Sequence, residues 1–267
     1  MRRREGGIAE RWSRRQSSHG WWNFGGDGRK EFHSIDSTLL PSPLYSQAYT
    51  DRWQTMSYAG GVPGREPMQV STAPRKPRIL LAACGSVSAI KFGHLCSCFS
   101  DWADVKAVVT PASMNFVDLS SIPKNVMLYT DEHEWSSWSK IGDSVLHIEL
   151  RRWADIMVIA PLSANTLAKI AGGLCDNLLT SIVRAWDYEK PIFVAPSMNT
   201  YMWKNAFTER HIIVIDELGI NLIPPASHRL ATGEYGTGVM AEPSFIFSTV
   251  RLFLESRKKA SSSSSRT

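Results

Sequence analysis

A short polar segment containing an amide follows an apolar run near the middle of the C-terminal half. Residues Ile192 to Ala195 predict a buried strand of a parallel sheet, which Pro196 ends. Ser197, Met198 and Asn199 come next, where the chain leaves the sheet. Because ligands of open α/β sheets bind at the carboxyl ends of the strands, Asn199 is a candidate for holding a polar ligand group. A plain strand-to-helix loop with an Asn cap is the alternative for this segment alone.

Three earlier apolar runs end in similar loops of small and polar residues. The predicted strands cover residues 78–83, 105–109 and 156–160, and the loops after them are Cys84–Lys91, Thr110–Ser113 and Pro161–Thr166. The first loop is a glycine turn that opens a helix, and its free backbone N–H groups suit a phosphate. A simple turn is the alternative, since neither G-x-G-x-x-G nor the Walker pattern is present. Four strand-then-loop units predict a doubly wound α/β domain with its ligand crevice along one sheet edge.

Composition limits the classes of protein to which the chain can belong. Of the 267 residues, 43% are hydrophobic, enough for a sizeable core. The net charge is +5, but much of the excess lies in the two termini, so no nucleic-acid footprint covers the interior. No apolar run approaches 18 residues, and we expect no membrane partner. Four cysteines fit no zinc pattern and predict reduced thiols without a metal site: Cys84, Cys96, Cys98 and Cys175.

The chain divides into three segments. Residues 1–73 show no sustained period and predict a disordered extension, residues 74–256 a folded domain, and residues 257–267 a disordered Ser-rich tail. Inside the domain we expect a surface loop over 131–144, a helix over 145–153, a helix over 206–211, a strand over 212–215 and a last helix over 244–255. Three glycines between residues 233 and 238 predict a mobile flap over 229–242, with a simple flexible connection as the alternative.

His147 lies beside apolar residues in the predicted helix 145–153. A packed, hydrogen-bonded histidine with a purely structural role is one interpretation. Histidine is nevertheless the side chain best suited to proton transfer near neutral pH. No second His or Cys lies at ligand spacing, so a metal role is not expected.

Five motifs together resemble the phosphopantothenoylcysteine decarboxylases, in particular the plant halotolerance-type flavoproteins. The resemblance covers about residues 74–256. The motifs are Gly85-Ser-Val-Ser-Ala-Ile-Lys91, His147-Ile-Glu-Leu-x-x-Trp-Ala-Asp155, Ala160-Pro-Leu-Ser-Ala-Asn-Thr166, Pro196-Ser-Met-Asn-x-x-Met-Trp203 and Gly233-Glu-Tyr-Gly-Thr-Gly-Val-Met-Ala-Glu242. The resemblance implies a Rossmann-like or flavodoxin-like flavoprotein fold with α/β/α layers, assembled as a homotrimer with FMN at the subunit interfaces.

The resemblance also implies roles for individual residues. His147 matches the essential histidine of the family, Asn199 the residue that holds the substrate carboxylate, and Met202 and Gly233 further substrate-binding positions. The implied FMN-binding residues are Gly85, Ser86, Val87, Ser88, Thr110, Pro111, Ala112, Ser163, Ala164, Asn165, Thr166, Ser197 and Met198.

The implied reaction converts 4′-phospho-N-pantothenoylcysteine to 4′-phosphopantetheine in coenzyme A biosynthesis. The flavin oxidises the thiol-bearing carbon, and CO2 is lost from the resulting thioaldehyde to give a stabilised enethiolate. Reduced flavin then returns the hydride while a flap cysteine delivers a proton. Here Thr232 occupies the position of that cysteine, and a hydroxyl is a far weaker acid than a thiol, whose ordinary pKa is about 8.5. We therefore expect oxidation and decarboxylation, with the final reduction impaired.

Three alternatives to a complete homomeric decarboxylase follow from the same residues. Thr232 favours a regulatory FMN-binding halotolerance protein of the phosphatase-inhibitor type, and a decarboxylase completed by a Cys-containing partner subunit in a mixed trimer is a further alternative. The retained His147 and Asn199 favour the decarboxylase, and the Ser- and base-rich tail lacks the acidic character of the regulatory relatives. A peptidyl-cysteine decarboxylase is a third possibility. The resemblance implies a cytoplasmic protein, with the nucleus as a second location.

Overall fold

The structure is a computed structural model that describes residues 75–229 and 235–264 of the chain. The predicted disordered extension 1–73 and the two site residues Thr232 and Gly233 lie outside these described residues.

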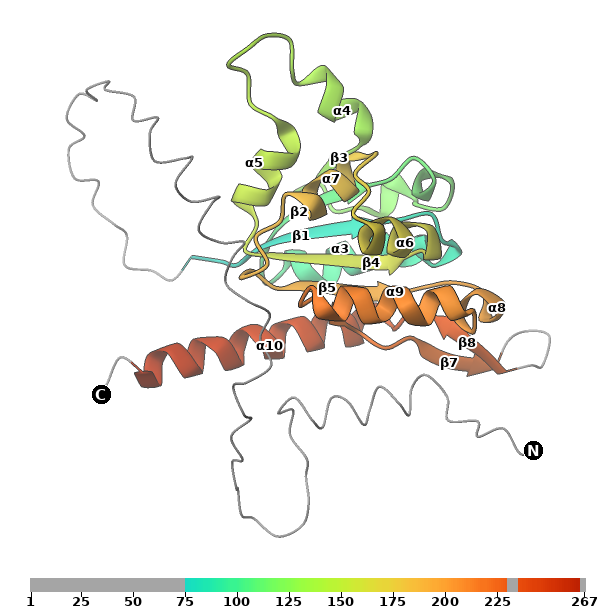
Figure 1. The fold of residues 1–267 in the computed structure, drawn as a ribbon. Helices are drawn as coiled ribbons and strands as arrows, with labels where there is room; N and C mark the ends of the chain where they lie inside the picture. Colours follow the sequence, from blue (N-terminus) through green and yellow to red (C-terminus); the bar gives the residue numbers. More distant parts are fainter. Residues whose placement is uncertain (1–74, 230–234, 265–267) are drawn as a thin grey trace, which may run out of the picture. The chain divides into compact units, whose positions relative to one another are not determined.

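A six-stranded parallel sheet forms the centre of the domain (Figure 1). Its strand order is β3-β2-β1-β4-β5-β6, the order of the dinucleotide-binding Rossmann folds rather than that of flavodoxin. The predicted doubly wound α/β fold is confirmed. The strands are β1 (Arg78–Ala83), β2 (Asp104–Val109), β3 (Met127–Tyr129), β4 (Ile156–Leu162), β5 (Ile192–Pro196) and β6 (Asn221–Leu222).

Both faces of this sheet are covered by helices. In β1, Ile79 and Leu81 belong to an apolar cluster with α3 (Phe92–Ser100) and α10 (Pro243–Ser264), where Phe99 packs edge-to-face on Phe247. Successive side chains of a strand point to opposite faces. Leu80 lies outside that cluster yet has no exposed surface, so a second layer must cover it.

Four helices build that second layer, and none of their buried residues belongs to the apolar cluster of α3 and α10. They pack on one another in pairs, α6 on α9, α5 on α7 and α6 on α7. Their bounds are α5 (Leu146–Trp153), α6 (Ala164–Gly172), α7 (Leu178–Arg184) and α9 (Ala206–Glu217). The domain therefore has the three layers α/β/α: one helical layer with α3 and α10, the sheet, and the layer of these four helices.

Short helices open or interrupt the connections. They are η2 (Val87–Lys91), η3 (Ser113–Asn115), η4 (Leu119–Ser121), α4 (Asp131–Ser136) and α8 (Thr200–Trp203). The loop expected over 131–144 therefore begins with a helix. Thr130 starts it through a capping box with His133, a signal that the acidic and Trp-rich composition masked.

The strand expected over 212–215 is wrong, because α9 continues through it to Glu217. Branched side chains favour strands, but Ile212 and Ile215 are buried while Ile213 between them is 37% exposed. Burial three residues apart matches a helix that lies on the sheet. The helix α7 was not predicted, although the capping box of Asn177 with Thr180 marks its start.

The predicted flap is largely an ordered hairpin in the described residues. Strands β7 (Ala226–Arg229) and β8 (Tyr235–Val239) pair antiparallel, and Gly238 and Met240 are buried. Beyond it, α10 runs to Ser264, past the expected end of the domain at residue 256. No Gly or Pro interrupts the sequence from Arg257 to Ser264, so nothing there breaks the helix.

Candidate active site

The strand order reverses between β1 and β4, which makes this the topological switch point of the sheet. Connections leave the two neighbouring strands toward opposite faces there, and the gap between them is where open α/β sheets bind ligands. The predicted loops after β1 and β4 both end at this point. A backbone hydrogen bond from Cys84 N to Pro161 O, 3.2 Å long, joins their starts.

Three serine hydroxyls from two of the predicted loops meet beside the switch point. Ser197 Oγ, after β5, lies 2.9 Å from Ser86 Oγ and 2.7 Å from Ser88 Oγ, both after β1. Ser197 is buried and its N–H donates to Leu162 O at 2.9 Å. No side chain caps η2, so the first backbone N–H groups of Val87 and Ser88 keep their donor capacity. This is a neutral cluster of donors suited to an anion.

The loop after β2 packs against the glycine turn. A Cβ on Gly85 would lie 2.6 Å from Ala112 Cβ, so only glycine allows the two loops to approach this closely. Thr110 is buried, and its backbone oxygen accepts the Ser113 hydroxyl at 2.7 Å. Pro111 and Ala112 complete this small-residue turn.

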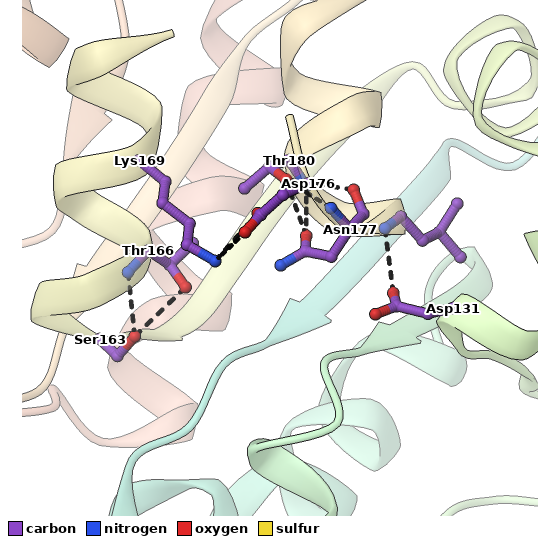
Figure 2. A network of polar contacts seen from close by, with 8 residues as sticks. Asp131, Ser163, Thr166, Lys169, Asp176, Asn177 and Thr180 are labelled. Atoms are coloured by element: carbon purple, nitrogen blue, oxygen red, sulfur yellow. Dashed lines mark hydrogen bonds and ion pairs between the residues drawn. The ribbon is translucent and has the colours of Figure 1, made fainter. Parts of the chain in front are cut away.

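The loop after β4 forms the N-cap of α6, shown in Figure 2. Ser163 Oγ accepts from Thr166 N at 3.2 Å and donates to Thr166 Oγ1 at 3.2 Å, and both residues are buried. Ala164 and the exposed Asn165 occupy the first turn of the helix. The structure thus brings together the predicted cofactor-binding residues of the loops after β1, β2, β4 and β5 at one sheet edge.

Donor chemistry and space in these loops fit a flavin mononucleotide phosphate. The donors are hydroxyls and backbone N–H groups, no carboxylate is among the predicted cofactor-binding residues, and the residue at the closest approach is glycine. Phosphates bind in such small-residue cradles at helix starts.

The segment carrying Asn199 is held by the hairpin. Met198 N donates to Gly238 O at 2.9 Å, and Thr200 Oγ1 donates to Thr237 O at 3.1 Å. Asn199 is exposed, and its Oδ1 accepts from Tyr201 N at 2.9 Å as the N-cap of α8. The amide nitrogen therefore remains as the donor that can bind a carboxylate. Met202 is 49% exposed on the same short helix.

His147 lies near the start of α5 and contacts an acid that sequence reasoning missed. Its Nδ1 is 2.6 Å from Glu134 Oε1, and the two side chains are 26% and 13% exposed. In the described part of the chain no hydrogen bond or ion pair joins His147 to Asn199 or to the serine cluster. Among the described residues, His147 is thus linked by a polar contact to Glu134 and not to the other predicted groups. Glu134 carried no sequence signal because it stands in the segment expected to be a loop.

Cys84 has no exposed surface and lies beneath the loop after β4. Burial raises the pKa of its thiol, and this outweighs hydrogen bonding with Thr166 and Ser163. A buried thiol under the phosphate loop is not placed to replace a proton donor in the flap.

A lysine–aspartate pair and a second helix cap continue from α6 toward α4 (Figure 2). Lys169 Nζ lies 2.9 and 2.6 Å from the two carboxylate oxygens of Asp176, and Asn177 Oδ1 accepts from Thr180 N at 2.9 Å. Leu178 N, the first residue of α7, donates to Asp131 Oδ1 at 3.0 Å. The start of α4 is thereby fixed to the layer of α6 and α7.

Within residues 75–229 and 235–264, no group of three or more His, Cys, Asp or Glu residues could hold a metal ion. None of the helices in this part of the chain has the length and apolar character needed to cross a bilayer.

Comparisons with known proteins agree with the fold. The family model described as flavoprotein matches residues 67–255. Phosphopantothenoylcysteine decarboxylase HAL3a of Glycine max is 72% identical over 202 residues, covering 74% of this chain and 96% of that protein. Phosphopantothenoylcysteine decarboxylase of Arabidopsis thaliana is 72% identical over 193 residues, covering 72% of this chain and 92% of that protein.

Two solved structures are similar at a TM-score of 0.66 and 73% identity, each covering 68% of this chain. One is the FMN-binding protein AtHal3, of which 98% is covered. The other, covered completely, is a cysteine-to-serine mutant of a PPC decarboxylase, complexed with pantothenoylaminoethenethiol. The chain therefore belongs to the flavoprotein family and, within it, to the phosphopantothenoylcysteine decarboxylases.

Proposed function

We propose that this chain catalyses the FMN-dependent decarboxylation of 4′-phospho-N-pantothenoylcysteine in coenzyme A biosynthesis. The observation that carries the proposal is the meeting of four strand-end loops at the switch point, with Ser86, Ser88 and Ser197 in contact and Asn199 directly after them. The names and FMN binding of the relatives support the same activity.

The predicted residues take distinct parts in this proposal. The loops after β1, β2, β4 and β5 hold FMN, which supplies hydride acceptance when bound. Asn199 offers its amide nitrogen to the substrate carboxylate while its oxygen remains in the cap of α8. A neutral donor positions the carboxylate without strongly stabilising its charge, which would oppose the loss of CO2. Met202 and Gly233 extend the substrate-binding surface, and His147 orients the substrate or transfers a proton.

Thr232 leaves the last reduction without its usual acid. A threonine hydroxyl cannot release a proton as a thiol does near neutral pH. We therefore propose that the enethiol product accumulates. The complex of a cysteine-to-serine mutant relative with an enethiol compound supports this direction. A protein that acts only by binding does not need a histidine paired with a carboxylate, as His147 is paired here. The regulatory role is therefore not favoured.

The product formed from phosphopantothenoylcysteine tests the proposal. Purified FMN-loaded protein and a Thr232→Cys variant would be incubated with the substrate, and the products identified by mass. We expect an oxidised, decarboxylated product from the unmodified protein and 4′-phosphopantetheine from the variant. Reduced product from the unmodified protein would disprove the role of Thr232, and no CO2 release from either would disprove the function.

We also propose a homotrimer. Apolar side chains are exposed around the α4–α5 segment, with Trp135 79%, Ile141 95% and Trp138 49% exposed, and His147 is in the helix that follows. Exposed apolar groups gathered in one segment mark interaction surfaces. Sedimentation should give three times the chain mass of 29.8 kDa. An FMN-loaded monomer would contradict the homotrimer.

We also propose a cytoplasmic location, with the nucleus as a second one. Microscopy of a fluorescent fusion protein would test this location.

A further inference from the structure

The pair formed by Glu134 and His147 joins two helices that follow one another in the connection between β3 and β4. The 2.6 Å contact runs from His147 Nδ1 on α5 to Glu134 Oε1 on α4. Only one oxygen of the carboxylate is used: Oε2 is buried and has no hydrogen-bond partner among the described residues. A buried carboxylate oxygen without a donor is costly and calls for an explanation in function.

A carboxylate accepts hydrogen bonds and cannot donate them. Its contact with Nδ1 therefore places a proton on that nitrogen. The other ring nitrogen, Nε2, can then form a hydrogen bond with, or exchange a proton with, another group. A carboxylate in this position also holds the ring plane in one orientation, as carboxylate partners of metal-ligating histidines do. Among the described residues, His147 thus has one engaged nitrogen and one available nitrogen.

The position of Glu134 is itself fixed. The α4 helix begins with the capping box of Thr130 and His133, and Asp131 Oδ1 accepts the first N–H of α7 at 3.0 Å (Figure 2). From α7 the polar contacts of Asn177 and the Lys169–Asp176 pair lead back to α6, whose cap Ser163 belongs to the predicted cofactor loop. The helix that carries Glu134 is therefore connected through α7 and α6 to the predicted cofactor loop.

From these contacts we propose that Glu134 is the positioning residue for His147, holding Nδ1 protonated so that Nε2 serves the substrate. The inference rests on the proposed decarboxylase function for the part that Nε2 plays. The positioning itself rests on the contact alone.

Single-turnover flavin reduction tests the proposal. FMN-loaded Glu134→Gln would be mixed anaerobically with phosphopantothenoylcysteine and followed by flavin absorbance. We expect the rate to fall about 10–100-fold, the range that the loss of a carboxylate partner causes at metal-ligating histidines, with FMN content and the substrate concentration for half-maximal rate unchanged. Glu132→Gln is the matched control, since this exposed glutamate is on the same helix, and its rate should stay that of the unmodified protein.

A double-mutant cycle separates positioning from a merely structural role. If Glu134 acts through His147, Glu134→Gln combined with His147→Asn should be no slower than His147→Asn alone. Additive losses, or a Glu134→Gln rate equal to that of the Glu132→Gln control, would overturn the proposal. Glu134→Asp, which keeps the carboxylate, should recover part of the rate and covers the case in which the glutamine variant does not fold.

Nitrogen-15 NMR of labelled histidine measures which ring nitrogen of His147 is protonated, and it needs no substrate. The His147 signal, identified by its absence in His147→Asn, should show a protonated Nδ1 that changes in Glu134→Gln and not in Glu132→Gln. An unprotonated Nδ1 in the unmodified protein would refute the positioning. If the NMR result holds while the substrate never reduces the flavin, the proposed function fails and the positioning stands.

Discussion

Asn199 uses the two ends of its side-chain amide differently. The oxygen caps α8 through Tyr201 N, and the nitrogen is exposed at the proposed substrate site. Aspartate keeps the cap acceptor but replaces the donor by a second negative charge. The fold and the substrate contact can therefore be separated by one substitution.

Asn199→Asp should lower kcat/KM by about 10–100-fold, because a hydrogen bond to a charged group contributes about 1.5–3 kcal/mol and is lost here. Steady-state kinetics and flavin absorbance would measure this, with FMN content unchanged. Asn205→Asp is the matched control, since Asn205 Oδ1 caps α9 in the same way through Phe207 N at 2.9 Å. Equal losses in the two variants would contradict the assigned role of Asn199.

At the scale of elements, β8 and the Asn199 segment behave as one unit. Gly238 has φ of +102°, a left-handed conformation, and a Cβ there would lie 2.7 Å from Met198 O and 3.0 Å from Trp203 Cβ. The same glycine's carbonyl oxygen accepts from Met198 N. Any side chain at this position both strains the backbone and pushes the strand away from the substrate segment.

Gly238→Ala should lower the free energy of unfolding by about 1–3 kcal/mol and reduce substrate turnover further than this instability explains. Thermal or denaturant unfolding and kinetics at low temperature would show both effects. Gly219→Ala is the comparison, with φ of +80° and no atom within 4 Å of the added carbon. It should cost about 1 kcal/mol from the backbone alone and leave turnover unchanged. If the two variants match in activity, the docking of β8 does not matter for the site.

At the scale of the whole domain, one carboxylate ties the start of β1 to the turn before β4. Asp155 contacts the Arg75 guanidinium through both oxygens, at 2.8 and 2.9 Å, and accepts from Arg78 N at 3.0 Å. Although burial raises the pKa of Asp155, the contacts with Arg75 and Arg78 hold it below its usual value. Because the folded pKa is lowered, this stabilisation is present above about pH 4 and is lost as pH falls through the folded pKa.

Asp155→Asn should therefore destabilise the protein at pH 7 by about 0.5–1 kcal/mol, a modest value because Arg75 is 61% exposed and screened by solvent. Urea unfolding from pH 7 to pH 3 should show the difference between the two proteins shrinking below about pH 4. Asp216→Asn, an exposed aspartate at the end of α9, should stay within about 0.5 kcal/mol at all pH values. A difference for Asp155→Asn that is as large at pH 3 as at pH 7 would rule out the ionic origin.

Local sequence determined much of this protein. Apolar runs ended by Gly, Pro or small polar residues identified β1, β2, β4 and β5, because strands covered on both faces are nearly continuous in apolar residues. The loops after them follow directly from the places where those runs end. For this reason the predicted cofactor-binding residues come together at one edge of the sheet.

Tertiary packing decided what local preference could not. The branched residues 212–215 became part of α9 because one face of that segment lies on the sheet, and propensity for strands is weaker than this burial. The partner of His147 was likewise invisible in sequence, since Glu134 reaches it only when α4 folds and Asp131 binds the start of α7. Contacts between separate elements depend on how the layers pack, and no spacing along the chain encodes them.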